Sequence, residues 1–290
     1  METRSKNVTL LALMALAALA GCKPRAGQGG SGSEAAGKPI TIKGSDTMVT
    51  LGQRWAEVYM KGHPGAVVQV TGGGSGTGIS ALINGTTDIC QASRQIKGKE
   101  TTMLKEKTSR EPVEIPVAKD GLAVYVNATN PMEEISVPQL NQIFTGKVTN
   151  WKELGGADAP IIVYSRENSS GTYVFFKEHV LESADFAAKA QTMPGTASVV
   201  NAVAKENNAI GYGGAAYAEG IKVLKVKKDE GSPAVSVSED TVRDGSYPLS
   251  RPLFFYLAKP PGGSVKPFID WVLSKQGQSL VADVGYFPVL

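Results

Sequence analysis

Two segments of small and hydroxyl residues with glycine, each followed directly by a helix-like apolar pattern, most constrain the fold of this 290-residue chain. Residues 72–79 are Gly-Gly-Gly-Ser-Gly-Thr-Gly-Ile, and residues 166–172 are Arg-Glu-Asn-Ser-Ser-Gly-Thr. A helix that begins after such a loop presents unpaired N–H groups and the positive end of its dipole to an anion. Glycine lets the backbone approach that anion closely. Together with Gly-Ser-Asp-Thr at 44–47, the two segments predict a small oxyanion held by several loops.

Strand and helix patterns alternate along the first third of the chain. The β-branched runs at residues 40–43 and 67–71 predict strands. Between them, apolar residues recur at helical spacing up to His63-Pro64, and a second helix is expected from Ile79 to Asn84. This order predicts an α/β fold with a mainly parallel sheet. In such folds ligands bind beyond the carboxyl ends of the strands, where these loops would lie.

Two similar apolar runs, at residues 116–125 and 252–257, bound the middle third of the chain. They are predicted to be crossover strands that join two lobes and form a hinge. Lobe 1 is expected to contain residues 39–118 and 253–290, and lobe 2 residues 119–252. Further strands are expected at 122–126, 161–165 and 254–258, and helices at 173–181, 197–205 and 266–273.

The N-terminus predicts export. Arg4 and Lys6 precede an uncharged run at residues 8–20, so residues 1–21 are expected to be a signal peptide. Leu-Ala-Gly-Cys at 19–22 resembles the lipobox of bacterial lipoproteins, which implies that Cys22 is acylated, as with palmitate, and becomes the new N-terminus. The Gly/Ser-rich residues 22–38 then form a flexible tether to the cell envelope, periplasmic or on the outer face of the cytoplasmic membrane. The alternative is an ordinary signal peptide with a chance cysteine.

Charge and rare residue types argue against several classes of function. The formal net charge is +3, and removal of residues 1–21 lowers it further, so no nucleic-acid partner is expected. After lipidation of Cys22, Cys90 is the remaining thiol, and a lone cysteine within Asp-Ile-Cys-Gln-Ala-Ser at 88–93 is expected to be a small buried hydrophobe rather than a reactive group. His63 and His179 lie far apart among polar residues, so neither a metal site nor a cofactor is expected.

At this point four motifs, in this order, resemble the phosphate-binding component of bacterial phosphate ABC transporters, the PstS type. They are Gly-Ser-Asp-Thr-Met at 44–48, residues 72–79, Asp-Ile-Cys-Gln-Ala-Ser-Arg at 88–94, and residues 166–172. The resemblance covers essentially the whole mature chain. It implies a two-lobed periplasmic-binding-protein fold of type II, with phosphate in the interlobe cleft. It also implies delivery to the permease subunits of the transporter, no chemical step and hence no enzyme, and a monomer held at the membrane by its lipid.

The resemblance also assigns the phosphate contacts, which are Ser45, Asp46, Thr47, Ser75, Gly76, Thr77, Ser93, Arg94, Arg166, Ser170, Gly171 and Thr172. Some members of the family carry an Asp where this chain has Arg94, so Asp46 becomes the expected carboxylate of the site. A fixed carboxylate accepts a hydrogen bond from the protonated oxygen of bound phosphate and repels sulfate, which leaves it unpaired. Arg166 and Arg94 would supply charged, fork-shaped donors. The simpler interpretations are that Asp46 caps a helix and that Arg94 is a salt-bridge partner.

Three other functions remain open from the residues. Residues 76–81 fit the dinucleotide pattern Gly-x-Gly-x-x-Ala, and Glu100 stands about 20 positions further on, but an exported protein lacks a supply of that cofactor. A secreted phosphatase would need clustered metal ligands or an activated nucleophile, and the two isolated histidines do not indicate either. A binding protein for another oxyanion, such as sulfate, molybdate or tungstate, would use the same helix-start donors.

Overall fold

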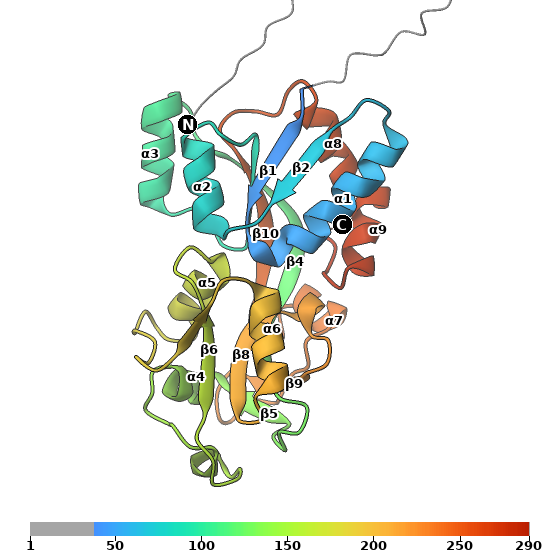
Figure 1. Cartoon of the computed structure of the whole chain (residues 1–290). Coiled ribbons are helices and arrows are strands. Elements are labelled where there is room, and N and C mark those ends of the chain that lie inside the picture. The colour runs from blue at the N-terminus through green and yellow to red at the C-terminus, as the bar shows by residue number, and fades with distance from the viewer. Residues whose placement is uncertain (1–37, 290) are drawn as a thin grey trace, which may run out of the picture. The chain divides into compact units, whose positions relative to one another are not determined.

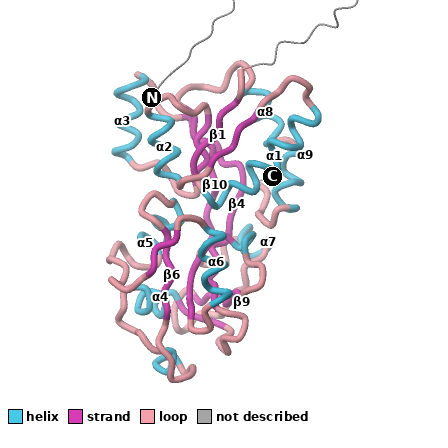
Figure 2. Tube along the Cα trace, in the orientation of Figure 1, coloured by secondary structure: helices cyan, strands magenta, loops and turns pink. Residues whose placement is uncertain are grey.

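The computed structural model describes residues 38–289, which belong to one compact unit. Cys22, the predicted signal peptide and all but the last residue of the predicted tether lie outside these residues. Strands occupy the middle of two lobes, and helices cover them from outside (Figures 1 and 2). Within the described range, no helix combines the length and apolar character needed to cross a bilayer.

The first lobe is built mainly from the N-terminal third of the chain and from two C-terminal helices (Figure 1). Its strands and helices are β1 (Ile40–Gly44), α1 (Val49–Gly62), β2 (Val68–Thr71), α2 (Ser75–Ile83), β3 (Ile89–Ala92), α3 (Gly98–Thr108), α8 (Val265–Val272) and α9 (Lys275–Asp283). A 3-10 turn at Asp46–Met48 leads into α1. The strand and helix order predicted for residues 40–84 is therefore confirmed.

The second lobe contains the middle of the chain (Figure 1). Its elements are β5 (Glu134–Ser136), α4 (Val137–Phe144), β6 (Ile162–Arg166), α5 (Gly171–His179), β7 (Gln191–Met193), α6 (Thr196–Lys205), β8 (Ala209–Gly214), β9 (Lys222–Lys227) and α7 (Glu239–Arg243). Short 3-10 turns occur at Trp151–Leu154 and Ala215–Tyr217. Strand β6 and helices α5 and α6 lie where the sequence predicts them.

Two long strands connect the lobes. Strand β4 (Val113–Val126) pairs antiparallel with β10 (Ser250–Leu257) and then continues into the second lobe, where it pairs with β8 and β9. The strands follow the order β2-β1-β3-β10-β4-β8-β6-β7. The prediction of a mainly parallel sheet is wrong at its centre, where β10 and β4 run antiparallel to their neighbours. The chain leaves the first lobe along β4 and returns along β10, so the two strands must run in opposite directions.

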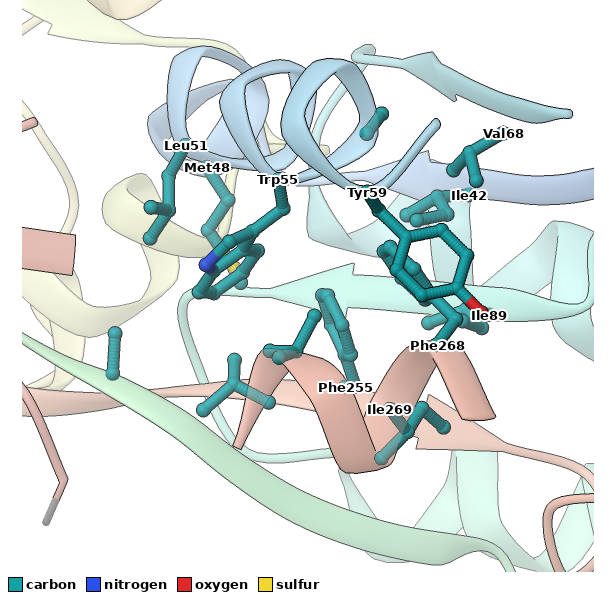
Figure 3. Packing of buried hydrophobic residues seen from close by; sticks show 14 of the residues in the cluster. Ile42, Met48, Leu51, Trp55, Tyr59, Val68, Ile89, Phe255, Phe268 and Ile269 are labelled. Carbon is teal, nitrogen blue, oxygen red and sulfur yellow. The ribbon is translucent and has the colours of Figure 1, made fainter. Parts of the chain in front are cut away.

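Separate apolar clusters fill the two lobes. In the first lobe, Trp55 and Tyr59 of α1 lie on one helical face because they are four residues apart. They pack against Phe255 of β10 and Phe268 of α8, and the Trp55 and Phe255 rings meet edge to face at 5.6 Å (Figure 3). Burial of a side chain of this size contributes about 2–3 kcal/mol. In the second lobe, Phe144 and Phe176 pack against Tyr212 in a cluster of their own.

Helix α2 lies against β1 and β3 on the other side of the first lobe. A methyl group at Gly78 would lie 2.6 Å from the Cα of Gly44, so this glycine of the dinucleotide-like pattern is required for close packing between helix and strand. Cys90 is fully buried beside it, which confirms the prediction of a small core residue. Burial raises the pKa of the Cys90 thiol, so that the uncharged form predominates at neutral pH.

Candidate functional site

Loops from both lobes meet where several strands end and two helices begin. Residues 45–47 follow β1, Ser93 and Arg94 follow β3, and Arg166 is the last residue of β6. Helix α2 begins at Ser75 in the first lobe, and α5 begins at Gly171 in the second. The site therefore forms at the carboxyl ends of strands, as α/β folds favour.

An ion pair between Asp46 and Arg166 joins the two lobes. Asp46 Oδ2 accepts from Arg166 Nη2 at 2.9 Å, and its Oδ1 accepts from the N–H of Gly73 at 2.7 Å. Arg166 is only 1% exposed and also donates from Nη1 to Thr196 Oγ1 at 2.8 Å. Burial lowers the pKa of the Arg166 guanidinium, and the Asp46 carboxylate opposes that shift, so Arg166 keeps its positive charge.

Buried hydroxyl groups lie on the loops that also carry this ion pair and at the starts of α2 and α5. Ser45 Oγ donates to Ser93 Oγ at 2.9 Å, and the Ser93 N–H donates to Ser75 Oγ at 3.1 Å. Thr47 Oγ1 and Thr172 Oγ1 lie 2.9 Å apart, one from each lobe. All five side chains are buried, which is costly for hydroxyl groups unless they are hydrogen-bonded. They supply adaptable donors and acceptors around one point.

The start of α5 lies directly against the serine cluster of the first lobe. A methyl group at Gly171 would overlap Ser75 Oγ and lie 2.7 Å from Ser93 Oγ, so only glycine fits there. The N–H of Gly76 donates across the lobes to the carbonyl of Ser169 at 2.9 Å. The beginnings of α2 and α5 therefore lie against each other, each with the positive end of its helix dipole.

The remaining predicted residues lie at the edge of this cluster. Arg94 is 8% exposed and forms two hydrogen bonds to the carboxylate of Glu100, at 2.8 and 2.7 Å. Ser170 caps α5 by accepting from the N–H of Tyr173 at 3.3 Å. Thr77 lies in the first turn of α2, half-buried, with its side chain toward Gly73.

Sequence reasoning missed a further buried ion pair beside the cluster. Arg251 of β10 donates from Nε and Nη2 to Asp120 Oδ2 of β4, at 3.0 and 2.8 Å. Burial raises the pKa of the Asp120 carboxyl, and Arg251 opposes this shift. A signal was present for Arg251, because it is the single charge in the apolar run at residues 250–257, and isolated buried charges are rare without a partner.

Neither histidine takes part in the site. His63 stacks on Tyr59 and His179 on Phe175, with ring centroids 4.0 and 4.1 Å apart. Over residues 38–289, no three His, Cys, Asp or Glu side chains gather as a metal-binding group.

Comparison with known proteins places the chain in a family. Residues 29–276 match the model of the PBP superfamily domain. The chain is 35% identical over 267 residues to the phosphate-binding protein PstS of Pseudomonas aeruginosa, which covers 86% of this chain and 83% of that protein. The chain belongs to the PstS family of the PBP superfamily. The phosphate-binding protein PstS of Bacillus subtilis is 33% identical and covers 99% of this chain and 95% of that protein.

Solved structures of phosphate transport proteins share the fold. A protein of Clostridium perfringens, solved with bound phosphate and described as a phosphate ABC transporter substrate-binding protein, superposes with a TM-score of 0.80. It is 33% identical, and the match covers 87% of this chain and all of that one. An ABC-type phosphate transport receptor of Vibrio cholerae is 29% identical, with a TM-score of 0.69 over 86% of this chain and 99% of that one. The two-lobed α/β fold predicted from the sequence is thereby confirmed.

Proposed function

We propose that this PstS-family protein binds inorganic phosphate between its lobes and delivers it to the permease subunits of an ABC transporter for high-affinity uptake. The names of its relatives support this proposal, since the Pseudomonas and Bacillus proteins are phosphate-binding proteins. So does the chemistry of the loop cluster, which is built of N–H, hydroxyl and guanidinium donors. The protein would bind and release its ligand unchanged.

The observation that carries the proposal is the state of Arg166. Its Nε is buried and has no hydrogen-bond partner among residues 38–289, although its other two nitrogens are engaged. A buried donor of a charged group is costly to leave unpaired. An oxyanion among the nearby hydroxyls would satisfy it, and the starts of α2 and α5 would offer further N–H groups.

The proposed phosphate contacts are those that the family resemblance assigns, and they differ in how close they lie to the centre of the site. Arg166, Thr47, Ser75, Gly171 and Thr172 form the centre of the site. Thr77, Ser170 and Arg94 lie at its edge, where Arg94 adds positive charge beside Gly76 while its fork is held by Glu100. Ser45, Gly76 and Ser93 complete the wall.

Asp46 would provide selectivity for phosphate. Its two oxygens accept one hydrogen bond each from Gly73 and Arg166, and an ionised carboxylate has about four acceptor positions. At neutral pH phosphate still carries a proton and can donate a hydrogen bond to Asp46, whereas sulfate carries none. Sulfate, molybdate and tungstate would offer no hydrogen to the remaining acceptor positions of this carboxylate and would be repelled by its charge.

Binding would close the lobes about β4 and β10. The contacts Asp46–Arg166 and Thr47–Thr172, and the hydrogen bond from the Tyr217 hydroxyl to the carbonyl of Asp46 at 2.9 Å, all join residues of different lobes. They form only when the lobes meet, so ligand capture and closure would be coupled. We place the lobes at residues 39–118 with 253–290 and at 119–252.

We further propose that the protein is exported and lipid-anchored at Cys22, as the lipobox-like residues 19–22 suggest, and that it acts as a monomer. Replacement of Cys22 by Ser is expected to move the protein from the membrane fraction to the soluble fraction of the envelope. If the wild-type protein and the variant are found in the same cell fraction, the lipid anchor is contradicted. Mass spectrometry of the N-terminal peptide would identify the modification directly.

Calorimetric titration of the full chain in detergent tests the function. Bound anion is first removed, and phosphate, sulfate and molybdate are then added at two pH values. Tight binding of phosphate alone is expected. Equal binding of sulfate or molybdate would assign the protein to another oxyanion. In a separate assay with a phosphate ester, release of phosphate would support a secreted phosphatase.

A further inference from the structure

Arg251 occupies an unusual position, because it touches both lobes from within the strands that connect them. It lies opposite Asp120 in the register of β10 and β4, and both side chains are almost fully buried. Its Nη1 donates to the carbonyl of Ser93, at the end of β3, at 3.1 Å. Its Nη2 donates to Thr172 Oγ1, in the first turn of α5, at 3.0 Å. One guanidinium thus contacts a site loop of each lobe.

A gain in stability does not explain why the Asp120–Arg251 ion pair is buried here. Burial of an ion pair costs as much as its attraction returns, and an apolar pair of similar volume serves a core equally well. Asp120 holds the guanidinium by two of its nitrogens, which fixes the plane of the fork. The Arg251 Cζ also lies 5.3 Å from the centre of the Phe175 ring in α5. The side chain is therefore oriented from several directions.

The contact with Thr172 determines where that hydroxyl can point. A threonine hydroxyl has one hydrogen and two lone pairs, and arginine can only donate. Thr172 Oγ1 must therefore accept from Arg251 and direct its own hydrogen elsewhere. The nearest partner on the other side is Thr47 Oγ1 at 2.9 Å, across the candidate site. Arg251 turns the Thr172 hydroxyl into a donor that faces the loops of the first lobe.

We propose that Arg251 is a positioning residue of the anion site, which orients the Thr172 hydroxyl as a donor toward bound phosphate. Asp120 acts through Arg251 by fixing its fork. The inference rests on the proposed function, because it assigns a role toward the same ligand. It adds a residue from the connecting strands to a site otherwise built from loops and helix starts.

A double-mutant cycle on the full chain tests the inference, with phosphate affinity measured by calorimetry. In the wild-type background, Thr172→Val should weaken phosphate binding about 10- to 100-fold, because a hydrogen bond to a charged ligand is lost. Arg251→Lys keeps the charge beside Asp120 but cannot reach Asp120 and Thr172 as a planar fork. It should weaken phosphate binding about tenfold. On that background the cost of Thr172→Val should shrink at least threefold.

Arg94→Lys provides the matched control, since it makes the same change in a buried pair that does not contact Thr172. On that background Thr172→Val should cost as much as in the wild type. If Arg251→Lys does not fold, Asp120→Leu/Arg251→Met removes both charges together and replaces it in the cycle. Urea unfolding of each variant in the absence of phosphate shows whether it is folded and how stable it is.

The outcomes separate the two proposals. Coupling between positions 251 and 172, absent between 94 and 172, supports the positioning role. Wild-type affinity in Arg251→Lys, or equal costs of Thr172→Val on all backgrounds, would overturn the inference and leave phosphate binding intact. Failure of the wild-type chain to bind phosphate would remove the proposed function and the inference with it.

Discussion

Two buried arginines, Arg166 and Arg94, each pair with a carboxylate but differ in what the pair joins. Arg166 ends β6 in the second lobe and reaches Asp46 in the first, 120 residues away in the sequence. Arg94 follows β3 and forms a fork with Glu100, six residues further on in the same lobe. Glu100 also accepts from the N–H of Lys97 at 2.8 Å, so this pair ties the end of β3 to the start of α3.

The difference shows that a buried charge near a site is not by itself a ligand contact. A pair within one lobe persists whether the lobes are open or closed and mainly stabilises a local connection. A pair between lobes forms only on closure, so its energy is linked to ligand binding. We therefore expect Arg166 to affect phosphate binding most, and Glu100, through Arg94, to affect stability most.

Replacement of Arg166 by Ala should have the largest effect. The bound anion loses its buried charged partner, and Asp46 is left facing it without compensation. Phosphate affinity should fall about 100- to 1000-fold, or roughly 3–4 kcal/mol. The same calorimetry should show a loss of phosphate affinity in Arg94→Ala that is at least about ten times smaller. Equal losses in the two variants would erase the distinction between the pairs.

Replacement of Asp46 by Asn should change selectivity. The amide keeps the size of the side chain and an acceptor for Gly73, but it removes the negative charge that disfavours sulfate. The ratio of phosphate to sulfate affinity should drop about tenfold or more. Competition of sulfate against labelled phosphate measures the ratio directly. An unchanged ratio would remove Asp46 from its proposed role.

Replacement of Glu100 by Gln should act on stability. Burial opposes ionisation of Glu100, but hydrogen bonds from Arg94 and Lys97 outweigh it and hold its pKa below the usual value. The folded state is therefore stabilised above the unfolded pKa of about 4.3, and this contribution disappears as pH falls through the lower folded pKa.

At pH 7 the free energy of unfolding should fall by about 1–2 kcal/mol in Glu100→Gln, and the difference from wild type should vanish in acid. Urea unfolding across pH 3–7 would measure this, with the exposed Glu57→Gln as control. A large loss of phosphate affinity in Glu100→Gln, with no loss of stability, would reverse the roles of the two pairs.

The smallest effect is expected from the caps of two helices. Ser170 caps α5 at the site and Ser274 caps α9 away from it, each accepting an N–H at 3.3 Å. Replacement of either serine by Ala should cost about 1 kcal/mol of stability. Only Ser170→Ala should also weaken phosphate binding, because it loosens the start of α5. Similar affinities in the two variants would mean that the Ser170 cap has no part in the site.

Much of the fold follows from local sequence patterns. The helical spacing around Trp55 and Tyr59 gives α1, and the β-branched runs beside it give β1 and β2. The antiparallel centre of the sheet was not predictable in this way, because it depends on the direction in which the chain returns along β10. Strand β3 was also missed, since its four residues include Cys90 and Gln91 and form no clear alternation.

The site was only partly accessible from sequence. Glycine, serine and arginine in two loops indicate anion contacts because helix starts and guanidinium groups attract anions. Asp120 and Arg251 lie 131 residues apart in the sequence, so their pairing requires the register of β4 and β10. In the same way, no local pattern distinguishes Arg94, with its partner in the next helix, from Arg166, with its partner in the other lobe.

A crystal structure of the protein with phosphate tests the central claim most directly. We predict a phosphate ion within hydrogen-bond distance of Arg166, with Ser75 from the first lobe and Thr172 from the second also in contact. An anion bound away from Arg166, whether beside Arg94 and Glu100 or on one lobe alone, would contradict the account.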